Sequence, residues 1–223
     1  MPINIAIDGP VGAGKSSISD AVAERLHILH LDTGAMYRAV GLALLRLGVD
    51  PGDEKAAMDR IGEIPVNVRY VDGKQHTYLG EEDVTDLIRT DEVSAAASSV
   101  SRWPAVRRAM VAAQQRMAAE TDMLIDGRDI GTVVLRNAPV KIYLTATPEE
   151  RARRRYEQNM AAGDNTPYEK VLEALIARDH QDMNRATDPL RQAEDAVLVD
   201  TTQLNFEESV EAVLRIVGQV YGN

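Results

Sequence analysis

A glycine-rich segment near the N-terminus constrains this chain more than any other feature. Residues 9–16 read GPVGAGKS, which fits the pattern G-x-x-x-x-G-K-[ST]. An apolar run rich in isoleucine, Ile3 to Asp8, precedes it, and a helical pattern from Lys15 to about Leu26 follows it. The segment is therefore predicted to be the turn between a buried strand and a helix, which is the context that the pattern requires.

This segment, called the P-loop below, has the residue types of a phosphate-binding turn. Glycines let the backbone curl so that several N–H groups point at phosphate oxygens, and the helix N-terminus adds a partial positive charge. Lys15 is expected to reach the β and γ phosphates of a nucleotide, and Ser16 to ligate Mg²⁺. A glycine-rich turn without a ligand is the alternative, and the agreement of pattern with context argues against it. The residues expected to contact the nucleotide are Gly9, Pro10, Val11, Gly12, Ala13, Gly14, Lys15, Ser16 and Ser17.

Further segments repeat the order of strand and helix. An apolar stretch from Ile28 to Asp32 precedes a helical pattern that ends at Gly48, and two such units predict an α/β fold with a parallel sheet. Further short strands are predicted at 123–126, 140–145 and 196–200. Further helices are predicted at about 91–120, with an interruption at Pro104, and at 206–220. Another helix is predicted to open at Pro148, and after a loop at 163–167 a long polar helix is predicted to run to about Arg185.

The stretch from Pro51 to about Thr90 has a different pattern. Alternating apolar residues at 66, 68 and 70 lead to Asp72-Gly73, a hairpin turn dipeptide, and Gln75 to Leu79 is predicted to be the returning strand. This stretch is predicted to be a small lobe inserted into the α/β fold.

Charge and composition limit the classes of partner. The chain has 223 residues and a formal net charge of -10, which argues against nucleic-acid binding because the average surface would repel a polyanion. It contains no cysteine, so disulfides and thiolate metal sites are excluded. No basic N-terminal segment precedes an apolar run, and no run of about 18 apolar residues is present. A cytoplasmic protein without membrane contact is expected.

Arginines are the candidates for binding a second anionic substrate. Phosphoryl transfer between two polyanions needs a high local density of cations, because the substrates repel each other and the transition state spreads negative charge. Arg128 and its neighbour Asp129 follow a predicted strand, at the carboxyl edge where open α/β sheets bind ligands. Solvent-exposed arginines in ordinary ion pairs remain the alternative. The candidates are Arg38, Arg128, the group Arg151 to Arg155, Arg178 and Arg185.

Six motifs together resemble the bacterial-type cytidylate kinases, which are P-loop nucleoside monophosphate kinases. The resemblance covers essentially the whole chain, and the insert at about 63–92 resembles the extra segment by which this family differs from shorter relatives. The motifs are GPVGAGKS at 9–16, DTGAMYR at 32–38, DGRDIGT at 126–132, APVKIYL at 138–144, EERARRR at 149–155 and RDHQDMNR at 178–185.

The resemblance implies a fold and a domain organisation. The fold is the three-layer P-loop NTPase fold with a central parallel sheet, an inserted acceptor-binding lobe and a small helical lid. Residues 1–223 would form a single kinase domain. Its parts would be a core at 1–34 and 100–223, the acceptor-binding lobe at about 35–99 and the lid at about 150–168.

The resemblance also implies roles for individual residues. Arg38, Arg128 and Arg185 would hold the acceptor phosphate, with Thr33 in the same substrate site as Arg38, and Arg178 and Asp182 would bind the ribose. The base would be read by Ser98, Arg107 and Asp129. The lid would bring Arg151 and Arg155 over ATP to act in catalysis together with Lys15 and the three phosphate-binding arginines.

The expected reaction is transfer of the γ-phosphoryl group of Mg-ATP to CMP or dCMP in pyrimidine nucleotide metabolism. Arginine donors and an aspartate acceptor suit cytosine, which offers acceptors at O2 and N3 and a donor at its exocyclic amine. No general base is expected, because a phosphate monoester has its second pKa near 6 and is largely ionised at neutral pH. Asp32 and Asp126 are expected to organise Mg²⁺, water or arginines. A monomer is expected.

Two alternatives remain open from the sequence. One is a P-loop kinase whose acceptor is a hydroxyl group, with Asp32 as the base. The other is a nucleotide-dependent switch that signals by conformation. The switch is disfavoured because no N-K-x-D motif for reading a base is present, and the many arginines suit a second anionic substrate.

Overall fold

The computed structural model describes residues 2–222, which form two compact units. The inserted unit comprises Leu29–Met123 and the segment before Asn4, and the P-loop unit comprises Asn4–Ile28 and the chain from Leu124 onward. The larger sheet has the strand order β2-β6-β1-β7-β8, and a smaller sheet has the order β3-β4-β5. A central parallel sheet with flanking helices confirms the predicted α/β class.

The strands of the P-loop unit run parallel, so their carboxyl ends meet at one edge. β1 pairs with β7 in the register Ile5↔Val140, and β7 pairs with β8 in the register Ile142↔Val197. Most of β1, β6 and β7 is buried, as expected for apolar strands with helices on both faces. The strands are β1 (Asn4–Asp8), β6 (Met123–Gly127), β7 (Val140–Thr145) and β8 (Val197–Asp200).

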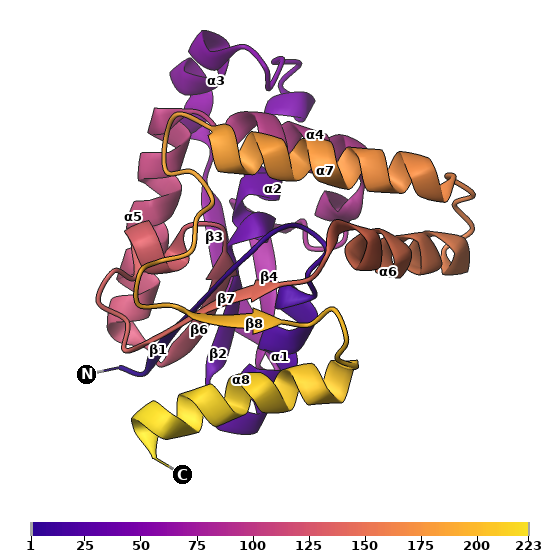
Figure 1. Cartoon of the computed structure of the whole chain (residues 1–223). Coiled ribbons are helices and arrows are strands. Elements are labelled where there is room, and N and C mark those ends of the chain that lie inside the picture. The colour runs from indigo at the N-terminus through magenta and orange to yellow at the C-terminus, as the bar shows by residue number, and fades with distance from the viewer. Residues whose placement is uncertain (1, 223) are drawn as a thin grey trace. The chain divides into compact units, whose positions relative to one another are not determined.

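Two helices of the P-loop unit, α6 and α8, start at residues with clear capping chemistry. Thr147 accepts a hydrogen bond from the Glu150 amide and Pro148 occupies the first turn of α6, while Asn205 and Glu208 form a capping box that starts α8. α1 contacts α8, and α6 and α7 lie side by side (Figure 1). The helices are α1 (Lys15–Leu26), α6 (Pro148–Ala161), α7 (Tyr168–Asn184) and α8 (Phe206–Tyr221), with a π-helical turn η3 at Ile130–Val134.

The inserted unit packs its helices closely around α2. A Cβ atom added at Gly41 of α2 would lie 2.9 Å from the backbone nitrogen of Ala97 in α4, so only glycine permits this approach. Its helices are α2 (Thr33–Arg46), α3 (Glu54–Arg60), α4 (Asp91–Val100) and α5 (Pro104–Glu120), with 3₁₀ turns η1 (Ile61–Glu63) and η2 (Leu87–Arg89). Its strands are β2 (Leu29–Asp32), β3 (Val66–Val71), β4 (Lys74–Leu79) and β5 (Glu82–Asp83).

The predicted hairpin in the insert is confirmed. β3 and β4 pair antiparallel with Val71 opposite Lys74. The two turn residues have positive φ, 52° at Asp72 and 77° at Gly73, which is the backbone of the hairpin turns that Asp-Gly favours. The compact unit that contains this hairpin extends from Leu29 to Met123, beyond the range of about 35–99 expected for the lobe.

Several short elements did not have a sequence signal. α3 has seven residues of which only Ala57 is buried, so its apolar periodicity is too weak to read. β5 has two residues, and the π-helical turn η3 depends on a contact from another segment described below. Pro104 is the first residue of α5, the helical position that proline favours, and it lies four residues beyond the end of α4.

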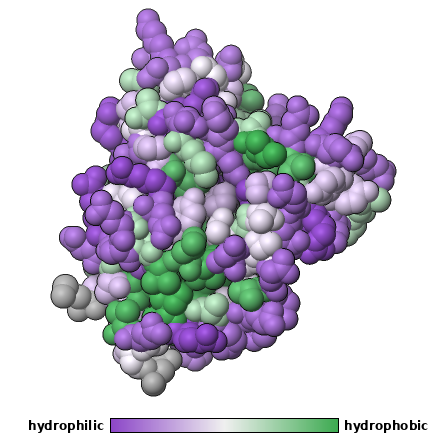
Figure 2. All heavy atoms as spheres, in the orientation of Figure 1, coloured by the Kyte–Doolittle hydropathy of each residue, from purple (hydrophilic) through white to green (hydrophobic). Residues whose placement is uncertain are grey.

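The surface over β8 is apolar. Val197 and Leu198 of this edge strand are 46% and 55% exposed. Figure 2 shows hydrophobic side chains gathered in the same area. Within residues 2–222, no helix combines the length and the apolar character that crossing a membrane requires.

Candidate active site

The P-loop begins where β1 ends, against the carboxyl end of β7. A Cβ atom at Gly9 would lie 1.9 Å from the carbonyl oxygen of Leu144, so any larger residue would displace the loop. Gly14, with φ of 86°, lies immediately before the first residue of α1. The helix N-terminus and the glycine turn therefore face the same edge of the sheet, as phosphate binding requires.

Lys15 is buried at the start of this helix. It is 6% exposed, and its Nζ donates a 2.7 Å hydrogen bond to the carbonyl oxygen of Pro10. Burial, with a smaller contribution from Arg128, lowers the pKa of Lys15 to about 7, although Asp126 and Asp8 favour its charged form. An anionic ligand beside Lys15 would restore the charge, since an opposite charge stabilises the ammonium form.

Ser16 and Asp126 place two oxygen ligands together. The Ser16 hydroxyl donates a 2.8 Å hydrogen bond to Oδ2 of Asp126, whose side chain lies at the end of β6 and is buried. A hydroxyl and a carboxylate are ligands that Mg²⁺ accepts, and Mg²⁺ in kinases uses one or two protein groups together with substrate phosphates. Among the described residues, no group of three His, Cys, Asp or Glu side chains is placed to hold a metal ion. Ser17, the next residue, is exposed.

Arg128, Arg178 and Asp182 form a cluster beside the P-loop. Nε of Arg128 lies 2.9 Å from Oδ2 of Asp182, and Nε of Arg178 lies 3.4 Å from the same carboxylate. Burial alone would raise the pKa of Asp182, but Arg128 and Arg178 hold it below its ordinary value. Burial lowers the pKa of Arg178. The cluster presents two guanidinium groups around one carboxylate, which leaves an excess of positive charge.

Arg185 and Asp129 form a second buried pair. NH2 of Arg185 lies 3.3 Å from Oδ1 of Asp129, and Nε of Arg185 donates a 2.7 Å hydrogen bond to the carbonyl oxygen of Asp188. Arg185 and Asp129 are 8% and 5% exposed. Because Arg128 and Asp129 are adjacent and Arg185 acts electrostatically on both Arg178 and Asp182, the structure brings together these five predicted site residues of the P-loop unit.

Asp8 lies next to these residues and was not predicted from the sequence. It is the last residue of β1, and its two carboxylate oxygens accept hydrogen bonds from the amides of Ile130 and Gly131 at 2.7 Å and 2.8 Å. Burial raises the pKa of Asp8 to about 6, although the two amides favour the ionised form. A carboxylate in the last position of an apolar strand, immediately before the P-loop, was the available signal.

The two lid arginines lie in different environments. Arg151 is 3% exposed, donates to the carbonyl oxygens of Ala146 and Val11 at 2.9 Å, and its NH2 lies 2.7 Å from Oδ2 of Asp179. Arg155 is exposed on α6, and no ion pair within residues 2–222 holds it. Arg151 thus fixes the P-loop to α6 and α7, while Arg155 keeps its guanidinium in solvent.

Arg38 and Asp32 form an ion pair within the inserted unit. NH2 of Arg38 lies 2.7 Å from Oδ2 of Asp32, whose Oδ1 accepts a 3.2 Å hydrogen bond from the Ala35 amide and caps α2. Asp32 therefore organises an arginine, as expected. Nε of Arg38 is buried without a hydrogen-bond partner among the described residues, which leaves a donor for an anion. Thr33, the residue after Asp32, is buried.

The side chain of Gln75, which lies on β4 in the insert, supports the DTGAMYR motif. Its Oε1 accepts a 2.7 Å hydrogen bond from the Asp32 amide, and its Nε2 donates a 3.2 Å hydrogen bond to the Asp32 carbonyl. The hairpin thereby fixes the backbone from which Arg38 extends.

Ser98 and Arg107, the predicted base-reading residues, lie in one buried region of the inserted unit. Arg107 is 2% exposed, and its guanidinium lies 5.9 Å from the ring centroid of Tyr37. Its NH1 donates a 3.4 Å hydrogen bond to the carbonyl oxygen of Ser101, whose hydroxyl donates to the Ser98 carbonyl at 2.9 Å. A buried guanidinium held in this way is suited to recognise a base through hydrogen bonds.

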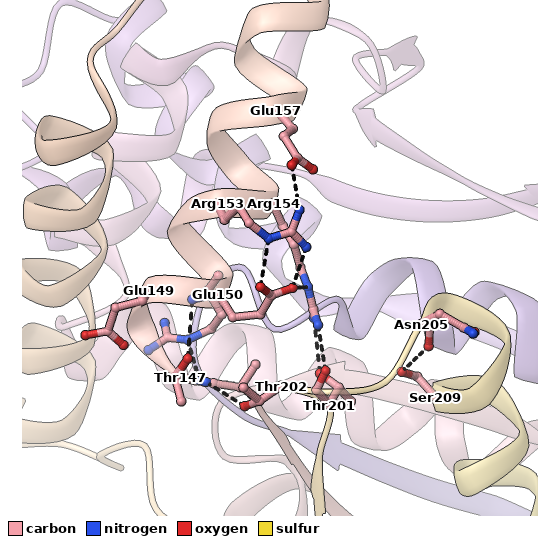
Figure 3. Close-up of polar contacts among 12 residues, drawn as sticks. Thr147, Glu149, Glu150, Arg153, Arg154, Glu157, Thr201, Thr202, Asn205 and Ser209 are labelled. Carbon is pink, nitrogen blue, oxygen red and sulfur yellow. Dashed lines mark hydrogen bonds and ion pairs between the residues drawn. The ribbon is translucent and has the colours of Figure 1, made fainter.

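A pocket of about 700 Å³ lies where the N-terminus of α6 meets the loop that follows β8. Figure 3 shows the contacts that join the two segments: the Thr147 amide donates to Thr202 at 3.0 Å, and Arg154 donates to Thr201 while it also contacts Glu150. The pocket is lined by Thr147, Glu149, Glu150, Arg153, Tyr168, Thr202, Gln203, Leu204 and Asn205. The lining has two carboxylates and one guanidinium, and Arg153 pairs with Glu150 at 2.7 Å, so the pocket has no excess of positive charge for the phosphates of a ligand.

Solved structures support the fold. The chain matches a gluconokinase from Sinorhizobium meliloti 1021 with a TM-score of 0.50 and 18% identity, over 99% of this chain and 94% of that one. It also matches an uncharacterized protein from Eubacterium ventriosum with a TM-score of 0.55 and 10% identity, over 99% of each chain. At these identities the matches show the α/β fold alone.

Sequence relatives identify the family. The chain is 47% identical to a protein from Caldicellulosiruptor bescii named cytidylate kinase, over 99% of this chain and 98% of that protein. It is 48% identical to a protein of the same name from Mycobacterium leprae, over 99% of this chain and 97% of that protein. The family model described as cytidylate kinase matches residues 5–219. The chain therefore belongs to the cytidylate kinase family.

Proposed function

We propose that the chain transfers the γ-phosphoryl group of ATP to CMP or dCMP and so forms CDP or dCDP. As a member of the cytidylate kinase family it is an ATP-dependent nucleoside monophosphate kinase. The observation that carries the proposal is the charge cluster of Arg128, Arg178 and Arg185 with Asp129 and Asp182, in the same unit as the P-loop. Arg128 lies near enough to Lys15 to lower its pKa.

The proposed chemistry is in-line transfer supported by positioning and positive charge. Lys15 stabilises the charge on the transferring phosphoryl group, while Arg128 and Arg185 hold the acceptor phosphate. Arg38 is likewise proposed to bind the acceptor phosphate, through an Nε that has no hydrogen-bond partner among the described residues. The acceptor phosphate is largely ionised at neutral pH, so its oxygen attacks without a protein base.

Mg²⁺ is proposed to be held by Ser16, with Asp126 beside it. Bound there, the ion would neutralise the charge of the β and γ phosphates. The hydrogen bond between the Ser16 hydroxyl and Asp126 supports this assignment, because it already orients both oxygens.

Five residues are proposed to recognise the nucleoside. Ser98 and Arg107 are proposed to read cytosine together with Asp129, and Arg178 and Asp182 to bind the sugar. Uracil reverses the donor and acceptor at two positions, which leaves buried partners unpaired at about 1–3 kcal/mol each. The expected preference for CMP over UMP is therefore about tenfold or more.

The pocket at α6 is proposed to receive the adenosine of ATP. It lies at the carboxyl ends of β7 and β8, the edge from which the P-loop also leaves β1, and open α/β sheets bind nucleotides at this edge. Arg155 is proposed to close over the phosphates from α6. Arg151 is proposed to act through its contact with Val11 of the P-loop.

An acceptor panel tests the function. ADP release is coupled to an indicator reaction, with CMP, dCMP, UMP, AMP, a sugar and a cyclic alcohol as acceptors. Activity on CMP and dCMP is expected, and activity on a hydroxyl acceptor alone contradicts the proposal. The hydroxyl alternative needs Asp32 as a base, but this carboxylate already accepts hydrogen bonds from Arg38 and the Ala35 amide.

Two further properties are proposed with the function. The enzyme is proposed to act in the cytoplasm and to be a monomer. Size-exclusion chromatography with light scattering should give a mass near 24.4 kDa. Equilibrium binding of CMP without ATP distinguishes the kinase from a nucleotide-dependent switch, which would bind no second nucleotide.

A further inference from the structure

We propose that Asp8 is the positioning residue that holds the acceptor-binding segment 128–131 at a fixed place relative to the P-loop. This inference rests on the proposed function. No sequence motif assigned a role to Asp8, and its position differs from that of every predicted site residue: it belongs to β1, before the glycine turn begins.

The contacts of Asp8 span two motifs that are far apart in the chain. Its Oδ1 accepts from the Ile130 amide at 2.7 Å and its Oδ2 accepts from the Gly131 amide at 2.8 Å. The next residue in the chain is Gly9, where the P-loop starts. One buried carboxylate therefore connects the strand that leads into the P-loop with the segment that carries Arg128 and Asp129.

The geometry of the segment explains why such an anchor is needed. The residues after Asp129 form the π-helical turn Ile130–Val134, a rare conformation whose hydrogen-bond pattern differs from that of an α-helix. The first two amides of this turn are the ones that donate to Asp8. The carboxylate thus fixes the N-terminus of the turn, and with it the backbone from which the base-reading and phosphate-binding side chains extend.

Gly131 and Lys141 enclose the other side of the contact. A Cβ atom at Gly131 would lie 3.2 Å from Cδ of Lys141 and 3.4 Å from Oδ2 of Asp8. Lys141 is itself fixed by hydrogen bonds to the Arg136 carbonyl at 2.6 Å and to Asp195 at 2.8 Å. The segment therefore lies between a carboxylate and a lysine stem whose amine is fixed, and a larger residue at 131 would require that stem to shift.

The role of Asp8 is distinct from that of the P-loop residues. Its carboxylate oxygens both accept from the segment 130–131, whereas the cation of the P-loop, Lys15, donates to the Pro10 carbonyl. Loss of the Asp8 contacts should therefore impair the acceptor site more than the ATP site. A residue with only a structural role would weaken both substrates alike.

The test replaces Asp8 with asparagine, which keeps the size of the side chain. An amide has one oxygen acceptor, and its NH₂ group faces the second backbone amide, so one of the two hydrogen bonds is lost. In the D8N variant the KM for CMP is expected to rise about tenfold or more, and the preference for CMP over UMP to fall, because Arg128 and Asp129 are displaced. The Kd for ATP is expected to stay within about threefold of the wild-type value.

A second variant keeps the test decisive if D8N does not fold. Gly131→Ala adds a methyl group beside the same contact and changes no residue of β1 or the P-loop. It is expected to raise the KM for CMP with little change in ATP affinity. The matched control is Asp53→Asn, an exposed carboxylate that caps α3, for which both constants should equal those of the wild type.

The outcomes separate this inference from the proposed function. A wild-type enzyme that does not phosphorylate CMP overturns the proposed function. A wild-type enzyme that does so, together with D8N and G131A variants whose KM for CMP is unchanged, overturns the role of Asp8 alone. Equal losses of CMP and ATP affinity in D8N also overturn it, because they indicate a general structural role.

Discussion

Arg128 and Asp182 form a 2.9 Å ion pair in which the carboxylate side chain is 1% exposed and the guanidinium 21%. Arg178 lies against the same carboxylate at 3.4 Å. The pair joins the loop after β6 to α7, two segments that are far apart in the sequence. It fixes one arginine beside the P-loop, and NH1 of the same arginine donates a 3.1 Å hydrogen bond to the Gly127 carbonyl.

Replacement of Arg128 by alanine is expected to abolish most of the turnover. Removing one group that stabilises developing negative charge lowers kcat by about 10²–10³-fold. Asp182 keeps Arg178 at 3.4 Å but loses its closer partner, so the free energy of unfolding should also fall, by about 1–3 kcal/mol. Stopped-flow or coupled assays give kcat, and ATP binding on the same preparation shows that the fold persists. Arg60→Ala, which breaks an exposed pair with Glu63, is the control. Near-normal turnover in R128A would refute the assignment.

Binding of ATP is expected to take up a proton at alkaline pH. The pKa of Lys15 lies at about 7, lowered from 10.5 chiefly by burial, so Lys15 is largely neutral at about pH 8.5. The phosphates of ATP favour the charged form of Lys15 and raise its pKa. Close to one proton per bound ATP should therefore be taken up at this pH, and close to none below about pH 6, where Lys15 is already protonated. Calorimetry in buffers of different ionisation enthalpy measures the uptake, and Lys15→Met should lack it.

The lowered pKa of Lys15 also makes the free energy of unfolding depend on pH. Between about pH 7 and 10.5 the unfolded chain binds a proton at Lys15 that the folded protein lacks, so this group makes the free energy of unfolding rise with pH across that window. Urea unfolding of the wild-type protein and of Lys15→Met at two pH values isolates the contribution. The wild-type protein should gain more stability than the variant between pH 7 and 10; a difference of opposite sign would contradict the shift.

Arg107→Met is expected to reduce the preference for cytosine. Methionine retains most of the buried volume beside Tyr37 but has no N–H donors. Loss of a hydrogen bond to the base corresponds to about 1–3 kcal/mol, so the ratio of kcat/KM for CMP to that for UMP should fall about tenfold or more. Steady-state kinetics with both acceptors measure the ratio. An unchanged ratio would show that Arg107 does not contact the base.

Asp126→Asn is expected to raise the Mg²⁺ concentration required for activity. The amide keeps a hydrogen bond with Ser16 but removes a negative charge beside the proposed metal. Activity is titrated with free Mg²⁺ at constant ATP, and the midpoint should shift to higher concentration, with Asp53→Asn unchanged. A coincident titration curve for D126N would place the metal elsewhere.

Arg151 and Arg155 are expected to respond differently to alanine substitution. Arg151→Ala leaves Asp179 buried without its partner and removes a donor from the Val11 carbonyl, so the free energy of unfolding should fall by about 3 kcal/mol. Arg155→Ala should leave stability within about 0.5 kcal/mol, because the side chain is exposed, and lower kcat instead. Urea unfolding and kinetics of both variants test the contrast. A normal kcat in R155A would show that Arg155 does not act in catalysis.

The sequence by itself determined the elements and the chemistry of the P-loop. The start of α1 at Lys15 and its end at Leu26, the limits of β7 and the Asp-Gly hairpin all follow from local signals, namely glycine turns, apolar periodicity and caps. Such signals involve residues close in the chain, which is why they can be read without a structure. The family motifs likewise named Arg128, Arg178 and Arg185 as members of one site.

Only the tertiary structure decided which of these charges are paired and which are open to solvent. From the sequence, Arg151 and Arg155 are both expected to act from the lid. In the structure, Asp179 and the P-loop backbone bind Arg151, while Arg155 stays exposed. The two amides that Asp8 accepts from lie more than a hundred residues further along the chain. Burial and partners at such separations depend on how the strands are ordered in the sheet, and no local pattern encodes that order.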